Sequence, residues 1–230
     1  MMHLKGFEKF SLLDYDNKVS AVFFFAGCNM RCPFCHNADI VLNPNFTPDL
    51  DINEAMEYLK NRKGLIDAVV VSGGEPTLLP ELLSLLRDIK ELGYEIKLDT
   101  NGTNPKVLKD IMDEDLVDYL AMDIKNSFKK YSLTSGKNIN IHDIQDSIHL
   151  IMSSGKDYEF RTTLIDGYHT LEDIKEIKEM IKGAKKYRLQ KFVDNERCIK
   201  DGLKEVPIET AKTFVEELKD SITNVELRGY

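Results

Sequence analysis

The chain has 230 residues, of which 42% are hydrophobic and 30% are charged, and its formal net charge is -8 at pH 7. A chain of this length buries a substantial core, and barrels of this size routinely form one domain. The acidic balance and an isoelectric point near 5.2 argue against nucleic acid as the main partner. The longest early apolar run, residues 21–26, is far too short to span a bilayer, so we expect no membrane partner.

The first 17 residues alternate charged and apolar side chains and lack the apolar core of a signal peptide. They predict an opening strand or hairpin that extends a single domain covering residues 1–230. Nothing points to secretion, and reduced thiols fit the cytoplasm, where we expect the protein to act.

Short apolar runs alternate with helical patterns along the rest of the chain. The runs predict strands at 19–25, 68–72, 95–99, 117–122, 158–163 and 187–190. A leucine-rich segment predicts a helix over 79–92, and a helix near 208–218 precedes a last short strand at 225–228. Regular alternation of this kind indicates a parallel sheet with crossover helices. About six such units predict an α/β fold of the partial (β/α)6, TIM-like barrel type.

Three of the four cysteines, Cys28, Cys32 and Cys35, fall within eight residues directly after Gly27. The spacing C-x3-C-x2-C lets three thiolates converge on one inorganic centre. An iron-sulfur cubane has four irons and normally takes four cysteines, so three ligands leave one iron open. An open metal position is typical of a catalytic site, whereas structural sites are closed. The motif therefore predicts an enzyme.

Other interpretations of the cysteines fit less well. Structural zinc needs a second ligand pair about 12 to 20 residues further on, and none follows Cys35. His36 is adjacent to Cys35, so the two can hardly complete one tetrahedron. Disulfides are disfavoured because the three cysteines are crowded and odd in number. Cys198, in the polar stretch 194–198, is either an incidental free thiol or a remote fourth cluster ligand.

The string CNMRCPFCHN at residues 28–37 resembles the signature of the radical S-adenosylmethionine (SAM) superfamily, and within it the enzymes that activate glycyl-radical enzymes. Later segments carry the resemblance in order: SGGEP at 72–76, LDTNG at 98–102, MDIK at 122–125 and RTT at 161–163. In detail the chain looks most like the activating proteins of anaerobic ribonucleotide reductase, and next like pyruvate formate-lyase activating enzymes. Ala38 replaces a proline found in many relatives, which alters loop stiffness and leaves the ligands untouched.

These segments lie at the carboxyl ends of predicted strands, where barrels of this kind gather catalytic residues. The cysteine loop follows the first internal strand, residues 73–76 follow the second, and Asp99 ends the third. Asp123 follows the fourth strand, and Arg161 lies within the fifth. We expect all of them to meet at one mouth, although each alone has a plainer interpretation as a turn or a solvated charge.

The chemistry of SAM suggests roles for these residues. Gly73 and Gly74 have no side chains, so the backbone can approach the methionine moiety of SAM. Glu75 can accept a hydrogen bond from the ammonium group of SAM. Lys125 and Arg161 are expected to balance the SAM carboxylate. Their charges suit that role because SAM presents one amino and one carboxylate group to the open iron.

Asp99 is expected within reach of the SAM ammonium or ribose. The resemblance to pyruvate formate-lyase activating enzymes implies that Asp99, Thr100 and Asp123 help to bind a monovalent cation beside SAM. It also implies that the backbone of residues 34–36 supports the adenine, and His36 acts either as a base or as a packing partner there. The complete predicted SAM site comprises Phe34, Cys35, His36, Gly73, Gly74, Glu75, Asp99, Asp123, Lys125 and Arg161.

The resemblance implies an activase that uses a [4Fe-4S] cluster to cleave SAM and to generate a glycyl radical on a partner glycyl-radical enzyme. The partner expected first is anaerobic ribonucleotide reductase. It implies anaerobic conditions, with flavodoxin or ferredoxin as electron donor. One alternative is a radical SAM enzyme that acts on a small molecule, such as a deazapurine synthase. The other is an iron-sulfur electron carrier, which the open coordination position disfavours.

Overall fold

A computed structural model describes residues 2–194 and 198–230. Residue 1, in the N-terminal extension, and residues 195–197, in the polar stretch before Cys198, lie outside the described residues. The chain divides into two compact units. Unit 1 contains the described residues up to 29 together with 37–100 and 106–120, and unit 2 contains 30–36, 101–105 and those from 121 onwards. A single domain over residues 1–230 stays a prediction.

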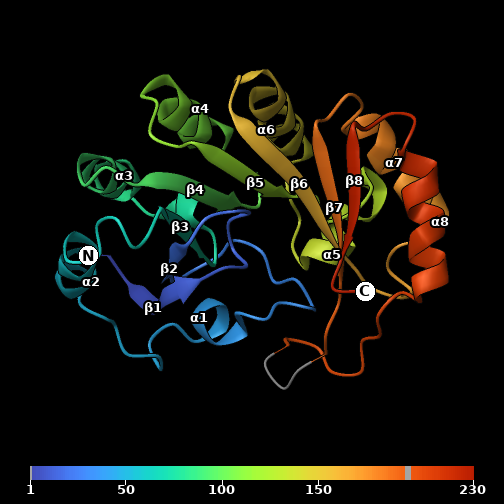
Figure 1. The fold of residues 1–230 in the computed structure, drawn as a ribbon. Helices are drawn as coiled ribbons and strands as arrows, with labels where there is room; N and C mark the ends of the chain where they lie inside the picture. The colour runs from blue at the N-terminus through green and yellow to red at the C-terminus, as the bar shows by residue number, and fades with distance from the viewer. Residues whose placement is uncertain (1, 195–197) are drawn as a thin grey trace. The chain divides into compact units, whose positions relative to one another are not determined.

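Unit 1 is built on four strands in chain order, β1 (Leu4–Ser11), β2 (Ser20–Phe25), β3 (Ala68–Gly73) and β4 (Glu95–Thr100) (Figure 1). β1 runs antiparallel to β2, whereas β2, β3 and β4 are parallel. Residues 69–71 of β3 are fully buried valines, the residue type that a strand covered on both faces favours. The three predicted strands of this unit are confirmed.

The helices of unit 1 are α1 (Ala38–Leu42), α2 (Ile52–Lys60), the 3-10 helix η1 (Pro76–Leu78), α3 (Leu82–Glu91) and α4 (Pro105–Asp113), whose first residue belongs to unit 2. The helix predicted over 79–92 begins three residues late, at Leu82. Leu79 has an extended backbone, with ψ 118°. The cause is Pro80, because a residue before proline is driven out of the helical region.

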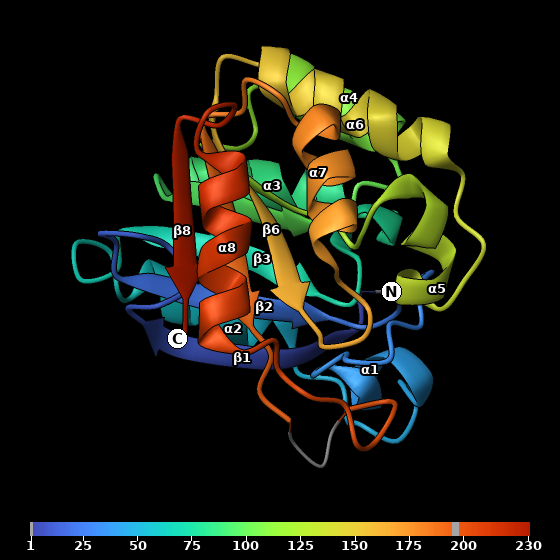
Figure 2. The same cartoon turned by 90° about the vertical axis from the view of Figure 1, so that its right-hand side faces the viewer.

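Unit 2 contains three parallel strands, β6 (Asp157–Leu164), β7 (Lys186–Lys191) and β8 (Asn224–Arg228). Its helices are η2 (Phe128–Lys130), α5 (Tyr131–Ser135), α6 (Ile141–Ser153), α7 (Leu171–Met180) and α8 (Ile208–Leu218). Figures 1 and 2 show α7 and α8 together on one face of these strands, and α8 packs on α7 and β8. β5 (Tyr119–Asp123) is divided between the units after Leu120.

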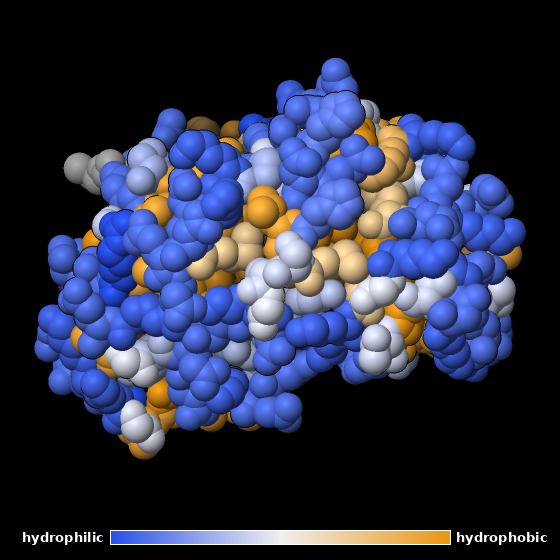
Figure 3. Space-filling view, turned by 90° about the horizontal axis from the view of Figure 1, so that it is seen from above, coloured by the Kyte–Doolittle hydropathy of each residue, from blue (hydrophilic) through white to orange (hydrophobic). Residues whose placement is uncertain are grey.

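Strands and helices alternate in both units, and the strands of each unit follow chain order, which confirms the predicted α/β fold of the partial-barrel type. Hydrophilic residues dominate the face shown in Figure 3, consistent with a 30% share of charged residues. In the part of the chain that the structure describes, every helix is too short or too polar to cross a membrane.

Candidate functional site

Both units carry predicted site residues at the ends of parallel strands. In unit 1, Cys28 follows β2, Gly74 follows β3, and Asp99 is the penultimate residue of β4. In unit 2, Asp123 ends β5 and Arg161 lies within β6, where its carbonyl oxygen accepts from the N–H of Ile124 at 2.8 Å. The sequence motifs thus occupy the edges where parallel strands place catalytic groups.

In unit 1, Gly74 packs against the backbone that leads into the cysteine motif. Its N–H donates to the Phe25 carbonyl at 2.9 Å, and the Glu75 N–H donates to the Gly27 carbonyl at 2.8 Å. A Cβ on Gly74 would lie 1.9 Å from the Gly27 oxygen and 3.3 Å from the Cβ of Cys28. Glycine is required here because the chain's own backbone fills the space that a Cβ would occupy. The approach of SAM to this turn stays a prediction.

Gly73 is constrained twice. Its φ of +126° is one that side chains disfavour, and a Cβ would lie 2.3 Å from both the nitrogen and the oxygen of Phe25. The Asn37 side chain donates to the Gly73 carbonyl at 2.8 Å. This bond joins the start of α1 to the end of β3.

Glu75 is a buried carboxylate, 2% exposed, that holds the turn to the neighbouring strand. Its Oε1 accepts from the Thr77 N–H at 3.1 Å, from the Thr77 hydroxyl at 2.6 Å and from the Thr100 hydroxyl at 2.8 Å. The turn after β3 is therefore tied to the end of β4. Roles for Glu75 toward SAM and for Thr100 toward a cation stay predictions.

Asp99 lies between a hydroxyl and an ammonium group. The Ser72 hydroxyl donates to Asp99 Oδ2 at 2.9 Å, and Lys97 Nζ lies 3.5 Å from Oδ1. Lys97 is 3% exposed and also donates to the Asp14 carbonyl at 2.5 Å. Lys97 was not among the predicted site residues. Residues i and i+2 of a strand share one face, so a lysine two residues before Asp99 was a usable signal.

In unit 2, residues 30–36 carry the other two motif cysteines. Cys32 is buried, at 7% exposed, and Cys35 is half-buried. His36 anchors this loop: its Nε2 lies 2.9 Å from the Val193 carbonyl, and its ring stacks on Phe192 with a centroid distance of 5.9 Å. Val193 offers only an acceptor, so Nε2 carries the proton in this contact. The base and adenine-packing roles of His36 both stay predictions.

Three charged side chains of unit 2 form a compact cluster. Asp123 Oδ1 lies 2.9 Å from Arg161 Nε, and Oδ2 lies 2.8 Å from Lys125 Nζ. Lys125 Nζ also lies 5.9 Å from the centre of the Phe34 ring. The cluster holds two positive charges and one negative charge, so it suits an anionic group such as a carboxylate.

The charges of Asp123, Lys125 and Arg161 keep all three side chains ionised. Burial alone would raise the pKa of Asp123, but the charges of Arg161 and Lys125 outweigh burial and hold that pKa below its ordinary value. Burial likewise acts to lower the pKa of Lys125, and the charges of Asp123 and Cys32 reverse the effect and raise it. Lys125 is thus electrostatically coupled to a motif cysteine.

A buried histidine supports the cluster from behind, and the sequence analysis missed it. His169 Nε2 lies 3.0 Å from the Lys125 carbonyl, and its Nδ1 accepts from the Ile165 N–H at 3.1 Å. Burial lowers the pKa of His169, so the ring stays neutral with its proton on Nε2. A lone histidine in the loop after β6 carries no sequence signal for this role.

The family comparison identifies the kind of protein. The family model described as the radical SAM superfamily matches residues 22–182. The chain belongs to the radical SAM superfamily. This confirms the family that the cysteine motif suggested, which is one of enzymes that use an iron-sulfur cluster and SAM.

Several radical SAM relatives are similar to the chain. A protein of Methanocaldococcus jannaschii, provisionally named a glycyl-radical enzyme activating enzyme, is 36% identical over 197 residues, which are 82% of this chain and 79% of the relative. A pyruvate formate-lyase-activating enzyme of Clostridium pasteurianum is 32% identical over 131 residues (55% and 53%). A 7-carboxy-7-deazaguanine synthase of Thermococcus kodakarensis is 27% identical over 152 residues (57% and 58%).

Among solved structures, SuiB of Streptococcus suis bound to S-adenosylmethionine matches with a TM-score of 0.68. The two are 15% identical, and the match covers 88% of this chain and 48% of SuiB. At this identity the likeness shows the fold alone, and that fold is the radical SAM core predicted from the sequence.

The donor chemistry fits a radical SAM cluster. In the described part of the chain the four cysteines form no disulfide, and thiolates are the usual ligands of an iron-sulfur cluster. Across residues 2–194 and 198–230, no three His, Cys, Asp or Glu side chains gather around a position for one metal ion. Cys28 belongs to unit 1, and Cys32 and Cys35 belong to unit 2. The cluster ligands and the monovalent cation site stay predictions.

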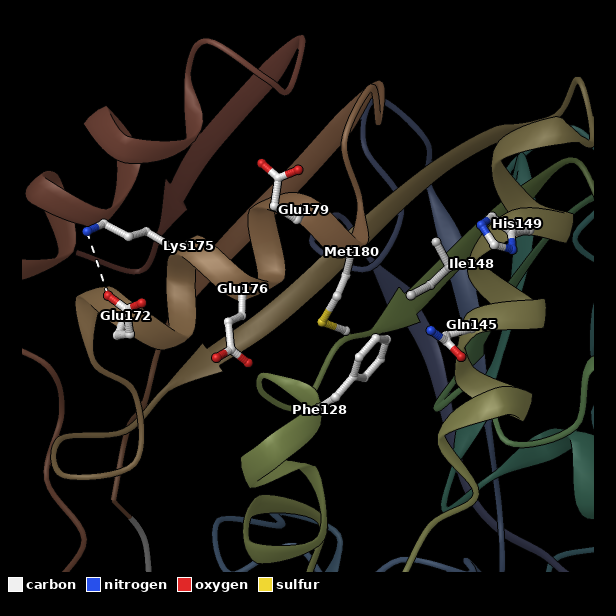
Figure 4. A pocket seen from close by; sticks show the side chains of 9 residues that line it. All are labelled: Phe128, Gln145, Ile148, His149, Glu172, Lys175, Glu176, Glu179 and Met180. Carbon is white, nitrogen blue, oxygen red and sulfur yellow. Dashed lines mark ion pairs between the residues drawn. The ribbon is translucent and has the colours of Figure 1, made fainter.

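A groove within unit 2 lies apart from these radical SAM motifs, between η2, α6 and α7 (Figure 4). It encloses about 560 Å³ and is lined by Phe128, Gln145, Ile148, His149, Glu172, Lys175, Glu176, Glu179 and Met180. Figure 4 shows Met180 and Phe128 pointing toward each other, with the glutamates along α7. Lys175 Nζ lies 3.7 Å from Glu172 Oε2. None of the predicted site residues lines this groove.

Proposed function

We propose that this radical SAM protein activates a glycyl-radical enzyme, and that Cys28, Cys32 and Cys35 hold its [4Fe-4S] cluster. The observation that carries the proposal is the Lys125–Asp123–Arg161 cluster, in which two partly buried cations flank one carboxylate and Lys125 is electrostatically coupled to Cys32. Such a cluster suits the carboxylate of SAM at the open iron.

When bound, a reduced [4Fe-4S] cluster would supply the one electron that cleaves SAM to methionine and a 5′-deoxyadenosyl radical, and this radical would remove a hydrogen atom from the glycine α-carbon. The chain's residues orient these groups. Lys125 and Arg161 offer N–H donors to the carboxylate, and ionised Asp123 fixes both cations. Neutral His169 fixes the backbone of Lys125.

We assign further contacts from the motifs. The Gly73–Gly74 turn and Glu75 bind the methionine end of SAM, Asp99 binds its ammonium or ribose, and the backbone of residues 34–36 supports the adenine. A monovalent cation held by Asp99, Thr100 and Asp123 completes the proposed site.

The proposed partner is anaerobic ribonucleotide reductase, because residues 28–37 and the later motifs look most like its activating proteins. The 36% identity to an activating-enzyme relative over most of both chains supports the wider class of glycyl-radical enzymes. We further propose flavodoxin or ferredoxin as electron donor and an anaerobic cytoplasmic setting, in which free thiols stay reduced.

The test is anaerobic reconstitution followed by reduction. With SAM alone the protein should form 5′-deoxyadenosine slowly, and with its glycyl-radical partner it should give a glycine-centred EPR doublet. The matched control is the same partner with its radical-bearing glycine changed to alanine, which should give no doublet. Holding the partner's loop against the reacting groups makes the transfer efficient, so short loop peptides should react weakly.

A second candidate is a radical SAM enzyme that acts on a small molecule, which the similarity to a 7-carboxy-7-deazaguanine synthase favours. It makes a distinct prediction. A deuterated metabolite would then consume SAM without any partner protein, and deuterium would appear in the 5′-deoxyadenosine. That result would replace the activase proposal.

A further inference from the structure

The end of α5 lies against the cysteine loop inside unit 2. The carbonyl of Ser135, the last residue of α5, accepts from the Arg31 N–H at 2.8 Å. The next residue, Gly136, caps the helix in the left-handed conformation, with φ +68°. Arg31 directly precedes Cys32, so this contact fixes the backbone of a motif cysteine.

The contact leaves no room for a side chain. A Cβ on Gly136 would lie 2.0 Å from the Arg31 carbonyl oxygen, 2.7 Å from its carbonyl carbon and 3.3 Å from its Cα. All three atoms are backbone, which cannot swing aside as the end of a long side chain can. Any residue other than glycine must therefore push the cysteine loop away from α5.

We propose that Gly136 is a positioning residue for the cluster: its missing side chain lets the cysteine loop dock on α5 and so sets the place of the Cys32 thiolate. The inference rests on the proposed function, in which Cys32 is a cluster ligand. Docking also accounts for the burial of Cys32, which is 7% exposed.

A plainer role for Gly136 is that of a helix cap, since glycine is common where a helix ends in the left-handed region. The two roles make different demands. A cap needs only a residue that tolerates positive φ, and asparagine is the side chain that does so best. Docking needs the Cβ to be absent, so asparagine fails there.

Gly155 provides a matched control within the same unit. It follows the end of α6, has φ +74°, and a Cβ on it would meet nothing within 4 Å. Gly155→Asn therefore changes a left-handed glycine of the same kind without a clash. Gly136→Asn adds the clash with Arg31 at a similar φ.

The experiment compares these two variants with the wild type, first without a cluster. Thiol labelling of Cys32, followed by peptide mass spectrometry under anaerobic conditions, should be about tenfold faster in Gly136→Asn and unchanged in Gly155→Asn. Both variants should keep the wild-type circular dichroism. Equal labelling of Cys32 in all three proteins would overturn the proposal.

The same variants are then reconstituted with iron and sulfide. Gly136→Asn should lose the change that SAM makes in the EPR spectrum of the reduced cluster, a readout that a helix cap would not move, and Gly155→Asn should retain it. If the wild type itself held no cluster, the proposed function would fail while the labelling result on Cys32 still judged the docking.

A measurement on the wild type covers the case in which Gly136→Asn does not fold. Hydrogen exchange of the Arg31 amide, read by NMR in the cluster-free protein, should be slow because the amide donates to the Ser135 carbonyl. Exchange at the rate of an unstructured peptide would show that the loop is not docked and would also overturn the proposal.

Discussion

Unit 1 and unit 2 hold their site residues by different physical means. In unit 1, Gly74 is fixed by backbone contacts with Gly27 that leave no space for a Cβ. In unit 2, Asp123 is fixed by the opposite charges of Lys125 and Arg161. Steric contacts of the first kind do not depend on pH, whereas charged contacts weaken when protonation removes the charge. The predicted site residues of the two units therefore respond to different perturbations.

The largest expected effect tests whether both units contribute ligands. Cys28→Ala in unit 1 and Cys32→Ala in unit 2 should each reduce SAM cleavage to background, because the motif supplies only three thiolates for four irons. The rate of 5′-deoxyadenosine formation measures this. Cys198→Ala is the control and should cleave SAM at the wild-type rate. If Cys198→Ala also lost its iron, the ligand set would include a fourth cysteine.

The steric contact between Gly74 and Gly27 in unit 1 is tested by Gly74→Ala. Its Cβ would overlap the Gly27 carbonyl, so we expect a loss of about 3 kcal/mol in the free energy of unfolding and weaker SAM binding. Gly64→Ala is the control, because Gly64 has φ +83° and a Cβ added there would meet nothing within 4 Å, which limits the loss to about 1 kcal/mol. Urea unfolding at several pH values measures both. A smaller loss for Gly74→Ala than for Gly64→Ala would contradict the clash.

The charged contacts of unit 2 are tested by Asp123→Asn, which leaves Lys125 and Arg161 without their shared carboxylate. We expect a loss of about 2 kcal/mol at pH 7, because the pair is only partly buried. The pKa of Asp123 is lowered in the folded state, so its contribution is present above the ordinary value of 3.8 and disappears as the pH falls through the folded value. The gap between variant and wild type should therefore narrow in acid.

Gly74→Ala is the natural comparison for that pH series, since its loss should not change with pH. A gap for Asp123→Asn that stays constant down to acid unfolding would mean that the carboxylate charge contributes nothing. Asp113→Asn, which removes an exposed carboxylate beside Lys109 on α4, should change stability little at any pH.

The smallest effect concerns His169, whose ring contacts the backbone carbonyl of Lys125. Burial lowers its folded pKa below the ordinary 6.5, so the unfolded chain takes up a proton first as the pH falls. Stability should therefore drop by about 1 kcal/mol between pH 7.5 and 5.5. His169→Gln should abolish this part of the slope, and His142→Gln, at an exposed position on α6, should keep it. Equal slopes in wild type and His169→Gln would show that the ring is not buried neutral.

Local patterns were enough to predict the α/β fold and its strands, because hydrophobic periodicity reports directly on burial. They misplaced the start of α3, where Pro80 bends Leu79 out of the helix. The motifs also led to the strand ends that carry Asp99 and Asp123. Short-range sequence information ended there.

Contacts between distant segments were beyond such patterns. Nothing local shows that Gly74 meets Gly27, that Gly136 meets Arg31, or that His169 holds the Lys125 backbone. Each depends on how loops after different strands pack, which no periodicity encodes. The sequence therefore predicted which residue types the proposed site uses, and the structure explains why Gly73 and Gly74 leave no room for a side chain.

The antiparallel pairing of β1 with β2 has a consequence for solubility. β2 reads Ser-Ala-Val-Phe-Phe-Phe, with no charge, proline or glycine, which is the composition of an aggregation-prone segment. β1 covers one edge of it with an alternation of lysines, glutamate and apolar residues, pairing Phe7 with Phe23 and Glu8 with Val22. Deleting β1 would leave a three-phenylalanine edge open to strand exchange between molecules, so the N-terminal strand protects the folded protein from amyloid-like association.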